Sequence, residues 1–431
     1  MTAAANWLTL DTAGKLFPAI ESIYRTETFR LSVTLKELID PGTLQSALEY
    51  VIHRFPSFKV RMQKGLFWYY FDPNEKTPIV EPDTLFPSRR IDRGKSRDYL
   101  FRVFHRNRTI SIDFFHAITD GTGGLVFLKT LTAEYLKRVH AHLHIPCTDG
   151  VMDCESEPHP EESDDAYKQY YKGPLKRYTS KEPVYHLRGR KEPRHIFHFT
   201  RIIINAAAMQ ERLKLQGIKV TEYMASILVY ALSLIQNSEL PKRKHKPIRI
   251  SIPVDMRRIY PSRTMRNFTL FVTPGIEPNL GDYSFREVLN QIHFALGYEM
   301  SEKFLSAELS SHVSVGNNPV IRFTPRIVKD RIMLFVYKNF GEKRYSTTIS
   351  NLGKIVVPDE MAPYVERINF NLPPNRINMS SATLTSFGEN MYLTVTSILR
   401  QPLLEQAVFR TLGEQQIHYS VETNRPGGLH M

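Results

Sequence analysis

The chain has 431 residues and a mass of 50.0 kDa, which exceeds the size at which one hydrophobic core usually keeps growing. Hydrophobic residues make up 42% of it and charged residues 23%, values typical of a globular protein. They exclude a disordered chain, a collagen and a membrane channel. We therefore expect two domains or subdomains with room for a buried site.

The chain shows no targeting or membrane-spanning segment. Its longest apolar run, Met224 to Ile235, is about half of the roughly 20 residues that a spanning helix needs. The amino-terminal residues 1–7 lack the basic and then apolar pattern of a secretory signal. Two sparse cysteines, Cys147 and Cys154, suit a reducing compartment as free thiols. These features predict a cytoplasmic protein.

The net charge of +13 and the pI near 9.5 favour encounters with anions such as phosphate-bearing cofactors or acidic lipid. The most basic run, residues 241–247, lacks the interleaved aromatic residues that nucleic-acid binding would add. We interpret it as a solvated loop and expect no nucleic-acid partner.

The first elements are a strand and a helix. Residues Arg30 to Leu35 have an extended pattern, and Asp40-Pro41 then supplies a helix N-cap followed by proline. The helix that follows, which ends before Pro56, has one apolar stripe: Leu44, Leu48, Val51, Ile52 and Phe55. Short aromatic strands are expected around Val60 and at residues 67–71.

A hairpin and a second helix come next. Tyr99 to Phe115 alternates apolar residues on two arms, with residues 106–108 as the turn. The second arm ends at His116 and is followed by the glycine-rich run Gly121-Thr-Gly123-Gly124. The next helix has the apolar positions Leu128, Leu131, Tyr135 and Val139. The predicted order is strand, tight loop, helix.

The composition changes between residues 146 and 194, where acidic residues and prolines crowd and apolar periodicity fades. We place a boundary here, with subdomains 1–180 and 181–431, both α+β. Thr221 is expected to cap a helix, and the tail after Thr423 to be mobile. The second unit contains these expected elements: strand His195–Ile204, helix Tyr223–Leu234, strand Ile248–Val254, helix Phe285–Tyr298, strands Thr347–Ile349, Ile377–Leu384 and Met391–Ile398, and helix Pro402–Leu412.

The segment His116-Ala-Ile-Thr-Asp120-Gly121 has the residue types of a catalytic loop. A histidine at a strand end can act as a general base in a cleft, and a glycine removes bulk where backbone turns or a ligand approaches. Two plainer interpretations stand beside this one. His116 can be a buried histidine satisfied by backbone hydrogen bonds, and Asp120 can be a helix cap.

Other chemistries are less well supported by the sequence. A metal site would draw on His140, His142, His144 and the two cysteines, but this spacing matches no standard zinc motif. We expect no metal. The chain lacks the Gly-x-Ser-x-Gly elbow of serine hydrolases and the glycine-rich loops that bind nucleotide phosphates.

The His116-to-Gly121 segment, with its Ile-Ser-Ile-Asp-Phe-Phe lead-in and Gly-Thr-Gly-Gly exit, resembles the active-site motif of the chloramphenicol acetyltransferase-like superfamily. This superfamily includes condensation domains of nonribosomal peptide synthetases, alcohol acetyltransferases and mycobacterial polyketide-associated acyltransferases. Other segments agree in order along nearly the whole chain: Arg54-Phe55-Pro56, Ile252-Pro253-Val254-Asp255-Met256-Arg257-Arg258, Asn267-Phe268 and Thr348-Ile349-Ser350-Asn351-Leu352-Gly353.

The resemblance implies a fold of two similar subdomains in a V-shaped pseudo-dimer with a channel between them. It implies that His116 is the general base and that Asp120 is structural and pairs with an arginine, with Arg257 as the candidate and Arg258 as the fallback. Gly121 completes the motif. Ser350 or Asn351 is the implied oxyanion donor, although both residues can equally form only a turn before Gly353.

The implied function is transfer of an acyl group from a thioester, with acyl-CoA as co-substrate and no permanent cofactor, to an alcohol or, second, an amine. Phe115 stands where condensation domains usually have another histidine, so an alcohol O-acetyltransferase is favoured. The alternatives are a standalone condensation-type domain that uses a carrier protein in trans, or an inactive homologue that only binds. We expect a monomer. Acyl length, the acceptor and the residues that bind coenzyme A stay open.

Overall fold

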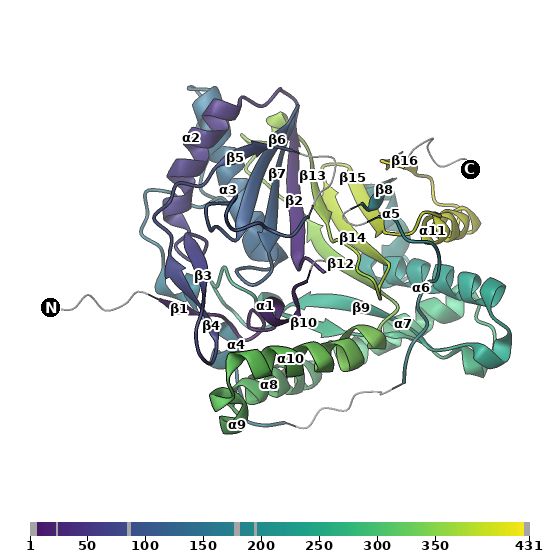
Figure 1. Cartoon of the computed structure of the whole chain (residues 1–431). Coiled ribbons are helices and arrows are strands. Elements are labelled where there is room, and N and C mark those ends of the chain that lie inside the picture. Colours follow the sequence, from purple (N-terminus) through teal and green to yellow (C-terminus); the bar gives the residue numbers. More distant parts are fainter. Residues whose placement is uncertain (1–6, 23–24, 84–87, 176–181, 194–195, 426–431) are drawn as a thin grey trace.

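The computed structural model describes residues 7–22, 25–83, 88–175, 182–193 and 196–425. Helices and strands are mixed along the chain, so the predicted α+β class is confirmed (Figure 1). Within these residues the strands form three sheets, and the buried apolar side chains gather in two clusters. No helix in the described part of the chain is long and apolar enough to cross a membrane.

The first large sheet has the strand order β13-β2-β7-β6-β5. Strand β2, second in this order, is buried at all eight positions, because it has neighbours on both edges and on its faces. The predicted hairpin is present as β6 and β7, which turn at Asn107. The strand bounds are β2 (Thr28–Leu35), β5 (Val80–Pro82), β6 (Phe101–Arg106), β7 (Thr109–Phe115) and β13 (Val365–Asn371).

Helices α2 (Pro41–Val51) and α3 (Gly121–Val139) pack on each other and on this sheet (Figure 1). The predicted cap of α2 is confirmed, since the Asp40 carboxylate accepts a hydrogen bond from the Thr43 amide at 2.7 Å. A small third sheet lies beside them, built from β1 (Leu8–Thr9), β4 (Tyr69–Pro73) and β3 (Val60–Lys64) in that order.

The second large sheet has the order β10-β9-β12-β14-β15-β8-β16, with β11 paired to β9. Strand β12 runs parallel to both of its neighbours, β9 and β14, whereas the other pairs are antiparallel. The bounds are β8 (His198–Asn205), β9 (Ile248–Asp255), β10 (Thr269–Val272), β11 (Gly275–Ile276), β12 (Thr347–Lys354), β14 (Ser380–Phe387), β15 (Asn390–Ser397) and β16 (Ser420–Thr423).

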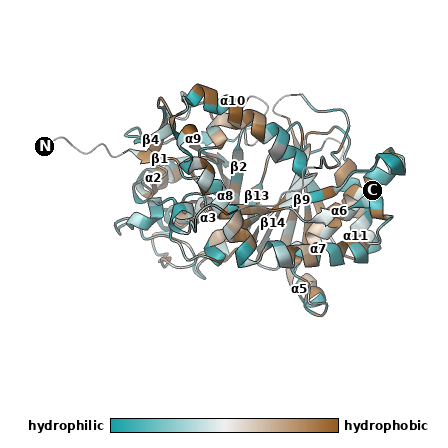
Figure 2. Ribbon diagram, turned by 90° about the horizontal axis from the view of Figure 1, so that it is seen from below, coloured by the Kyte–Doolittle hydropathy of each residue, from teal (hydrophilic) through white to brown (hydrophobic). Residues whose placement is uncertain are grey.

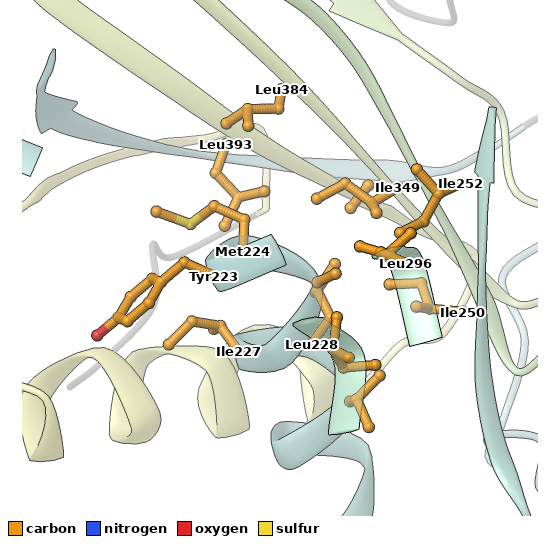
Figure 3. Close-up of a cluster of buried hydrophobic side chains, with 14 of the residues drawn as sticks. Tyr223, Met224, Ile227, Leu228, Ile250, Ile252, Leu296, Ile349, Leu384 and Leu393 are labelled. Atoms are coloured by element: carbon orange, nitrogen blue, oxygen red, sulfur yellow. The ribbon is translucent and has the colours of Figure 1, made fainter. Parts of the chain in front are cut away.

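Helix α6 (Val220–Glu239) forms the centre of the second core, with α5 (Ala206–Lys214), α7 (Phe285–Glu299) and α11 (Leu403–Glu414) around it. Met224 and Leu228 of α6 lie beneath strand residues such as Ile349 (Figure 3). Each of these side chains is completely buried, and burying one stabilises the fold by about 1.5–3 kcal/mol. This core holds β9, β12 and the segments that follow them in place.

The division between residues 180 and 181 stays a prediction. Elements on each side of it pack with the other side. Strand β13 from the second half pairs with β2 of the first sheet. Conversely, Ala166 and Tyr167, in the short helix α4 (Ala166–Gln169), pack into the second core. The two halves therefore share strands and core residues.

Some local predictions are wrong. Thr221 lies inside α6, which begins one residue earlier, and its hydroxyl accepts a hydrogen bond from Asn351. The tail beyond Thr423 is anchored as far as Arg425, which is buried and pairs with Glu405 at 2.5 Å. The expected mobility of residues 426–431 and the strand start at His195 lie outside the described residues.

The predictions also missed three consecutive helices, α8 (Glu302–Asn317), α9 (Pro319–Phe323) and α10 (Arg326–Val336). Figure 1 shows them together at the lower edge of the molecule, where α10 crosses in front of α8. Helix α10 packs on the short helix α1 (Phe17–Ile20).

Candidate active site

The loop between β7 and α3 holds the residues singled out by the sequence. Strand β7 ends at Phe115, and the His116 amide donates to the Glu27 carbonyl at 2.8 Å. Four residues later Asp120 is the N-cap of α3, with its carboxylate accepting from the Thr122 and Gly123 amides at 3.2 and 3.1 Å. The plainer interpretation of Asp120 as a helix cap is therefore confirmed, and it does not exclude a second role.

The other oxygen of Asp120 joins the two halves of the chain. Its Oδ2 accepts from the Phe268 amide at 2.8 Å, from the Thr269 hydroxyl at 3.1 Å and from Arg257 at 2.9 Å. Burial by itself raises the pKa of Asp120, but the Arg257 charge and these hydrogen bonds outweigh burial and hold the pKa below its usual value. Asp120 is therefore an anion at neutral pH.

Arg257 confirms the expected ion pair. It follows β9, and its Nη1 contacts both Asp120 and Asp255 at 2.9 Å. Its remaining nitrogens donate to the carbonyls of Thr264 and Arg266, at 3.0 and 2.5 Å. Because each of its three side-chain nitrogens has a partner, this largely buried guanidinium fixes the chain from 255 to 269 against the Asp120 loop. The fallback, Arg258, is not needed for the pair.

His116 lies between two aromatic rings. It stacks on Phe17 of α1, with ring centroids 4.5 Å apart, and meets the edge of Phe29 at 5.0 Å. The residue as a whole is partly buried rather than fully buried. Burial lowers the pKa of His116 more than the nearby Asp120 charge and the hydrogen bonds raise it. The neutral imidazole is thus the main form at pH 7.

Asn267 determines which nitrogen of His116 carries the proton. Its Nδ2 donates to the His116 carbonyl at 2.9 Å and to Asp11 at 3.1 Å, and a carbonyl can only accept. The amide oxygen Oδ1 must therefore face His116 Nδ1, which lies 2.9 Å away. Nδ1 is then the donor, and Nε2 keeps its lone pair. This is the tautomer that a general base needs.

Asp11 and Arg266 support Asn267 from behind. Asp11 is fully buried, accepts from the Gly14 amide at 2.6 Å and lies 3.6 Å from Arg266. Burial raises the pKa of Asp11, although Arg266 acts in the opposite direction. The sequence analysis quoted Asn267 only as part of a motif and did not find Asp11. No pattern marked Asp11, because it lies far from His116 along the chain.

Glycines allow the loop to approach its partner segment. A Cβ at Gly123 would lie 2.2 Å from the Met265 carbonyl oxygen, so no larger residue fits without moving backbone. Thr119 donates to the same carbonyl at 2.7 Å. A Cβ at Gly121 would lie 2.8 Å from the Leu352 side chain, which places β12 directly beside the start of α3.

The two predicted oxyanion donors differ in their surroundings. The Asn351 amide is already engaged, since Nδ2 donates to Thr221 at 2.8 Å and Oδ1 accepts from the Gly353 amide at 2.7 Å. Gly353 has a φ of +77°, and β12 continues through this position with a bulge instead of ending in the predicted turn. Ser350 is buried in the same strand and pairs in register with Thr383.

The histidine and cysteine residues of the metal alternative are dispersed. His140 contacts Glu37 at 3.2 Å and stacks near Tyr364, while Cys147 is exposed and Cys154 is half-buried. In the described part of the chain no group of three or more His, Cys, Asp or Glu side chains is placed to hold a metal ion.

No protein-family model and no curated protein matches the sequence. Solved structures match the fold. TRI101 from F. graminearum, complexed with coenzyme A and deoxynivalenol, matches with a TM-score of 0.62 and 10% identity. The match covers 96% of this chain and 100% of TRI101. TRI3 trichothecene 15-O-acetyltransferase from Fusarium sporotrichioides matches with a TM-score of 0.59 and 12% identity, and the match covers 94% of this chain and 93% of TRI3.

A third match is the X-domain from teicoplanin biosynthesis, with a TM-score of 0.55 and 10% identity. The match covers 97% of this chain and 98% of the X-domain. All three matches extend over nearly the full length of both chains, so they concern the whole architecture. At these identities they establish the fold alone. The chain therefore shares one fold with these two acetyltransferases and the X-domain.

Proposed function

We propose that this chain is an acyltransferase that moves an acyl group from an acyl thioester to an alcohol or amine, with His116 as the general base. The observation that carries the proposal is the contact of Asn267 with His116, which leaves Nε2 of the imidazole unprotonated. The lowered pKa of His116 supports it, since a base must be neutral before it can accept a proton.

The proposed reaction needs no covalent enzyme intermediate. The acceptor oxygen or nitrogen attacks the thioester carbonyl carbon while Nε2 of His116 takes its proton. As the carbon–sulfur bond breaks, the imidazolium returns that proton to the departing thiolate. The new ester or amide and the free thiol are the products. A positioned general base of this kind contributes about 10²- to 10⁴-fold in rate.

The other site residues have supporting roles in this proposal. Asp120 and Arg257 position the loop, because both are fully occupied with each other and with backbone groups. Ser350 is the better candidate for the oxyanion donor, since the Asn351 amide is engaged with Thr221 and with the bulge at Gly353. If the chain is divided between residues 180 and 181, the first half supplies His116, Asp120 and Gly121. The second half supplies Arg257, Ser350 and Asn351.

Coenzyme A is the proposed thiol carrier and an alcohol the preferred acceptor. The fold match to TRI101 in complex with coenzyme A supports the carrier, and the match to an enzyme named as a 15-O-acetyltransferase supports an oxygen acceptor. Phe115 before His116 agrees with this assignment rather than with peptide-bond formation.

The test is release of free thiol from acetyl-coenzyme A with a panel of alcohols and amines. We expect acceptor-dependent release by the wild-type chain and a loss of about 10²- to 10⁴-fold in His116→Ala. The matched control is His53→Ala, because His53 is an exposed histidine outside the loop. Activity that survives unchanged in His116→Ala would remove His116 from the mechanism.

A second candidate is a non-catalytic binding domain. It is favoured by the match to the X-domain, whose complex with OxyB is an example of this fold bound to another protein. The same assay separates the two candidates if donors on coenzyme A and on a carrier protein are both tried. Absence of acceptor-dependent thiol release from both donors would support the binding role.

A further inference from the structure

Helix α10 turns most of its apolar side chains outward, in contrast to the central core helix α6. Its outward residues are apolar: Ile327, Val328, Ile332, Phe335 and Val336, of which Phe335 is 63% exposed. The only fully buried residue of the helix is Lys329. We call these five outward residues the α10 surface. Monomeric proteins rarely expose so continuous an apolar strip unless it meets a partner or a membrane.

The inner side of α10 is held by polar contacts. The Lys329 ammonium lies over the Trp68 ring, 3.4 Å from its centroid. Asp330 pairs with Arg326 at 3.0 Å and accepts from the Tyr69 hydroxyl at 2.9 Å. These contacts fix the rotation of the helix about its axis with Lys329 and Asp330 inward, and the apolar side therefore faces outward.

Neighbouring elements extend the same surface. Phe323 of α9 is 66% exposed and meets Phe67, in the turn between β3 and β4, with ring centroids 6.2 Å apart. The Arg326 amide donates to the Leu66 carbonyl at 2.8 Å, which ties that turn to the start of α10. Figure 2 shows α9 and α10 along one outer margin, with hydrophobic colour on α10.

The charges around this surface are basic. Arg322, Arg331 and Lys338 are exposed on α9, on α10 and just beyond it. Asp330, the one acidic residue from 319 to 338 in the sequence, is used by Arg326 and Tyr69. An apolar helix face flanked by Arg and Lys suits the boundary between lipid headgroups and acyl chains when the headgroups are anionic.

We propose that the α10 surface docks the protein on an anionic phospholipid membrane, with α10 lying in the plane of the interface. The net charge of +13 adds long-range attraction to such a surface. This inference does not depend on the proposed acyl transfer.

The docking surface is close to the candidate site. Helix α10 packs on α1, and Phe17 of α1 stacks on His116. A membrane against α10 therefore lies one short helix away from the imidazole, which suits a substrate that is dissolved in the lipid.

The experiment is flotation of the full chain with vesicles of phosphatidylcholine alone and of phosphatidylcholine with phosphatidylserine in a three-to-one ratio. Wild-type protein should float with the anionic vesicles, and salt should weaken the binding. The double substitution Ile332→Ser with Phe335→Ser should lower the partition coefficient about tenfold or more. Arg331→Gln should lower it about fivefold on anionic vesicles only.

The matched control is Phe294→Ser, since Phe294 of α7 is 71% exposed but lies off the α10 surface. It should float like the wild type. Two results would overturn the proposal. One is wild-type protein that stays with neither vesicle. The other is a dimer, seen by light scattering, that the Phe335 substitution converts to a monomer without any change in flotation.

Discussion

The Asp120 loop and helix α10 both bury charged groups, but the loop also buries its apolar side chains and α10 exposes them. In the loop the charged groups lie inside the protein, where Asp120 and Arg257 pair with each other and form hydrogen bonds with backbone groups. In α10 the charged Lys329 also lies inside, but the apolar side chains face out. The loop is satisfied by its own chain, whereas α10 is complete only with something outside the protein.

The strongest test of this contrast removes the charge at the centre of the loop. Asp120→Ala should destabilise the fold by about 3–5 kcal/mol, because Arg257 and the amides at the start of α3 lose a buried partner. Urea unfolding measures this loss. Asp72→Ala, which removes an exposed ion pair with Arg61, should cost less than about 1 kcal/mol. Equal losses in the two variants would mean that the loop is not the tighter region.

Next in size is the close approach of the loop to its partner segment. Gly123→Ala should cost about 1–3 kcal/mol, since the new Cβ meets the Met265 carbonyl oxygen, which is backbone and cannot turn aside. The control is Gly413→Ala in α11, where no atom lies within 4 Å and alanine favours the helix. Thermal unfolding should show a lower Tm for the first variant and an equal or higher Tm for the second.

A finer test concerns the base itself. Burial lowers the pKa of His116, so the rate should rise with pH through a value below that of free imidazole and then level off. Asn267→Asp places a carboxylate beside Nδ1, favours the imidazolium and should move this acid limb to higher pH by about one unit. The pH profile of kcat/KM measures it, and an unmoved limb would contradict the contact.

The smallest effect belongs to the inner side of α10. Burial and the nearby Lys15 lower the pKa of Lys329 to about 8. Between this value and the normal lysine pKa the unfolded chain binds more protons, so the free energy of unfolding should rise with pH in that window. Lys329→Met should remove the rise. Lys338→Met, on the exposed side, should leave it in place.

Sequence periodicity predicted most elements that bury one apolar stripe. Helix α7 begins at Phe285 as predicted, and the α2 cap at Asp40 was identified from its residue type. Strand β12 was predicted as only three residues, because Asn351 and Gly353 read as a turn although the strand continues through a bulge.

Orientation is what the sequence could not provide. The apolar residues of α10 recur at helical spacing, so the helix itself was predictable, but the same spacing predicts an inward face. Its outward rotation depends on Trp68 and Tyr69, which are remote in the chain.

The candidate site divides in the same way. The motif located His116 and Asp120, and the resemblance supplied Arg257 as a partner, which the 2.9 Å contact confirms. The hydrogen bond from Asn267 to Asp11 joins residues that are 256 positions apart in the sequence, and no local sequence pattern predicts such a contact.

Strand β13 has a consequence for how the protein is made. Val365 pairs with Leu35 and Asn371 with Arg30, so the first sheet is unfinished until the ribosome has synthesised the chain as far as Asn371. Until then the edge of β2 is an open row of hydrogen-bonding groups, a template for pairing with other chains. Fragments that stop at residue 180 should therefore aggregate when expressed alone, and adding residues 355–371 in trans should restore their solubility.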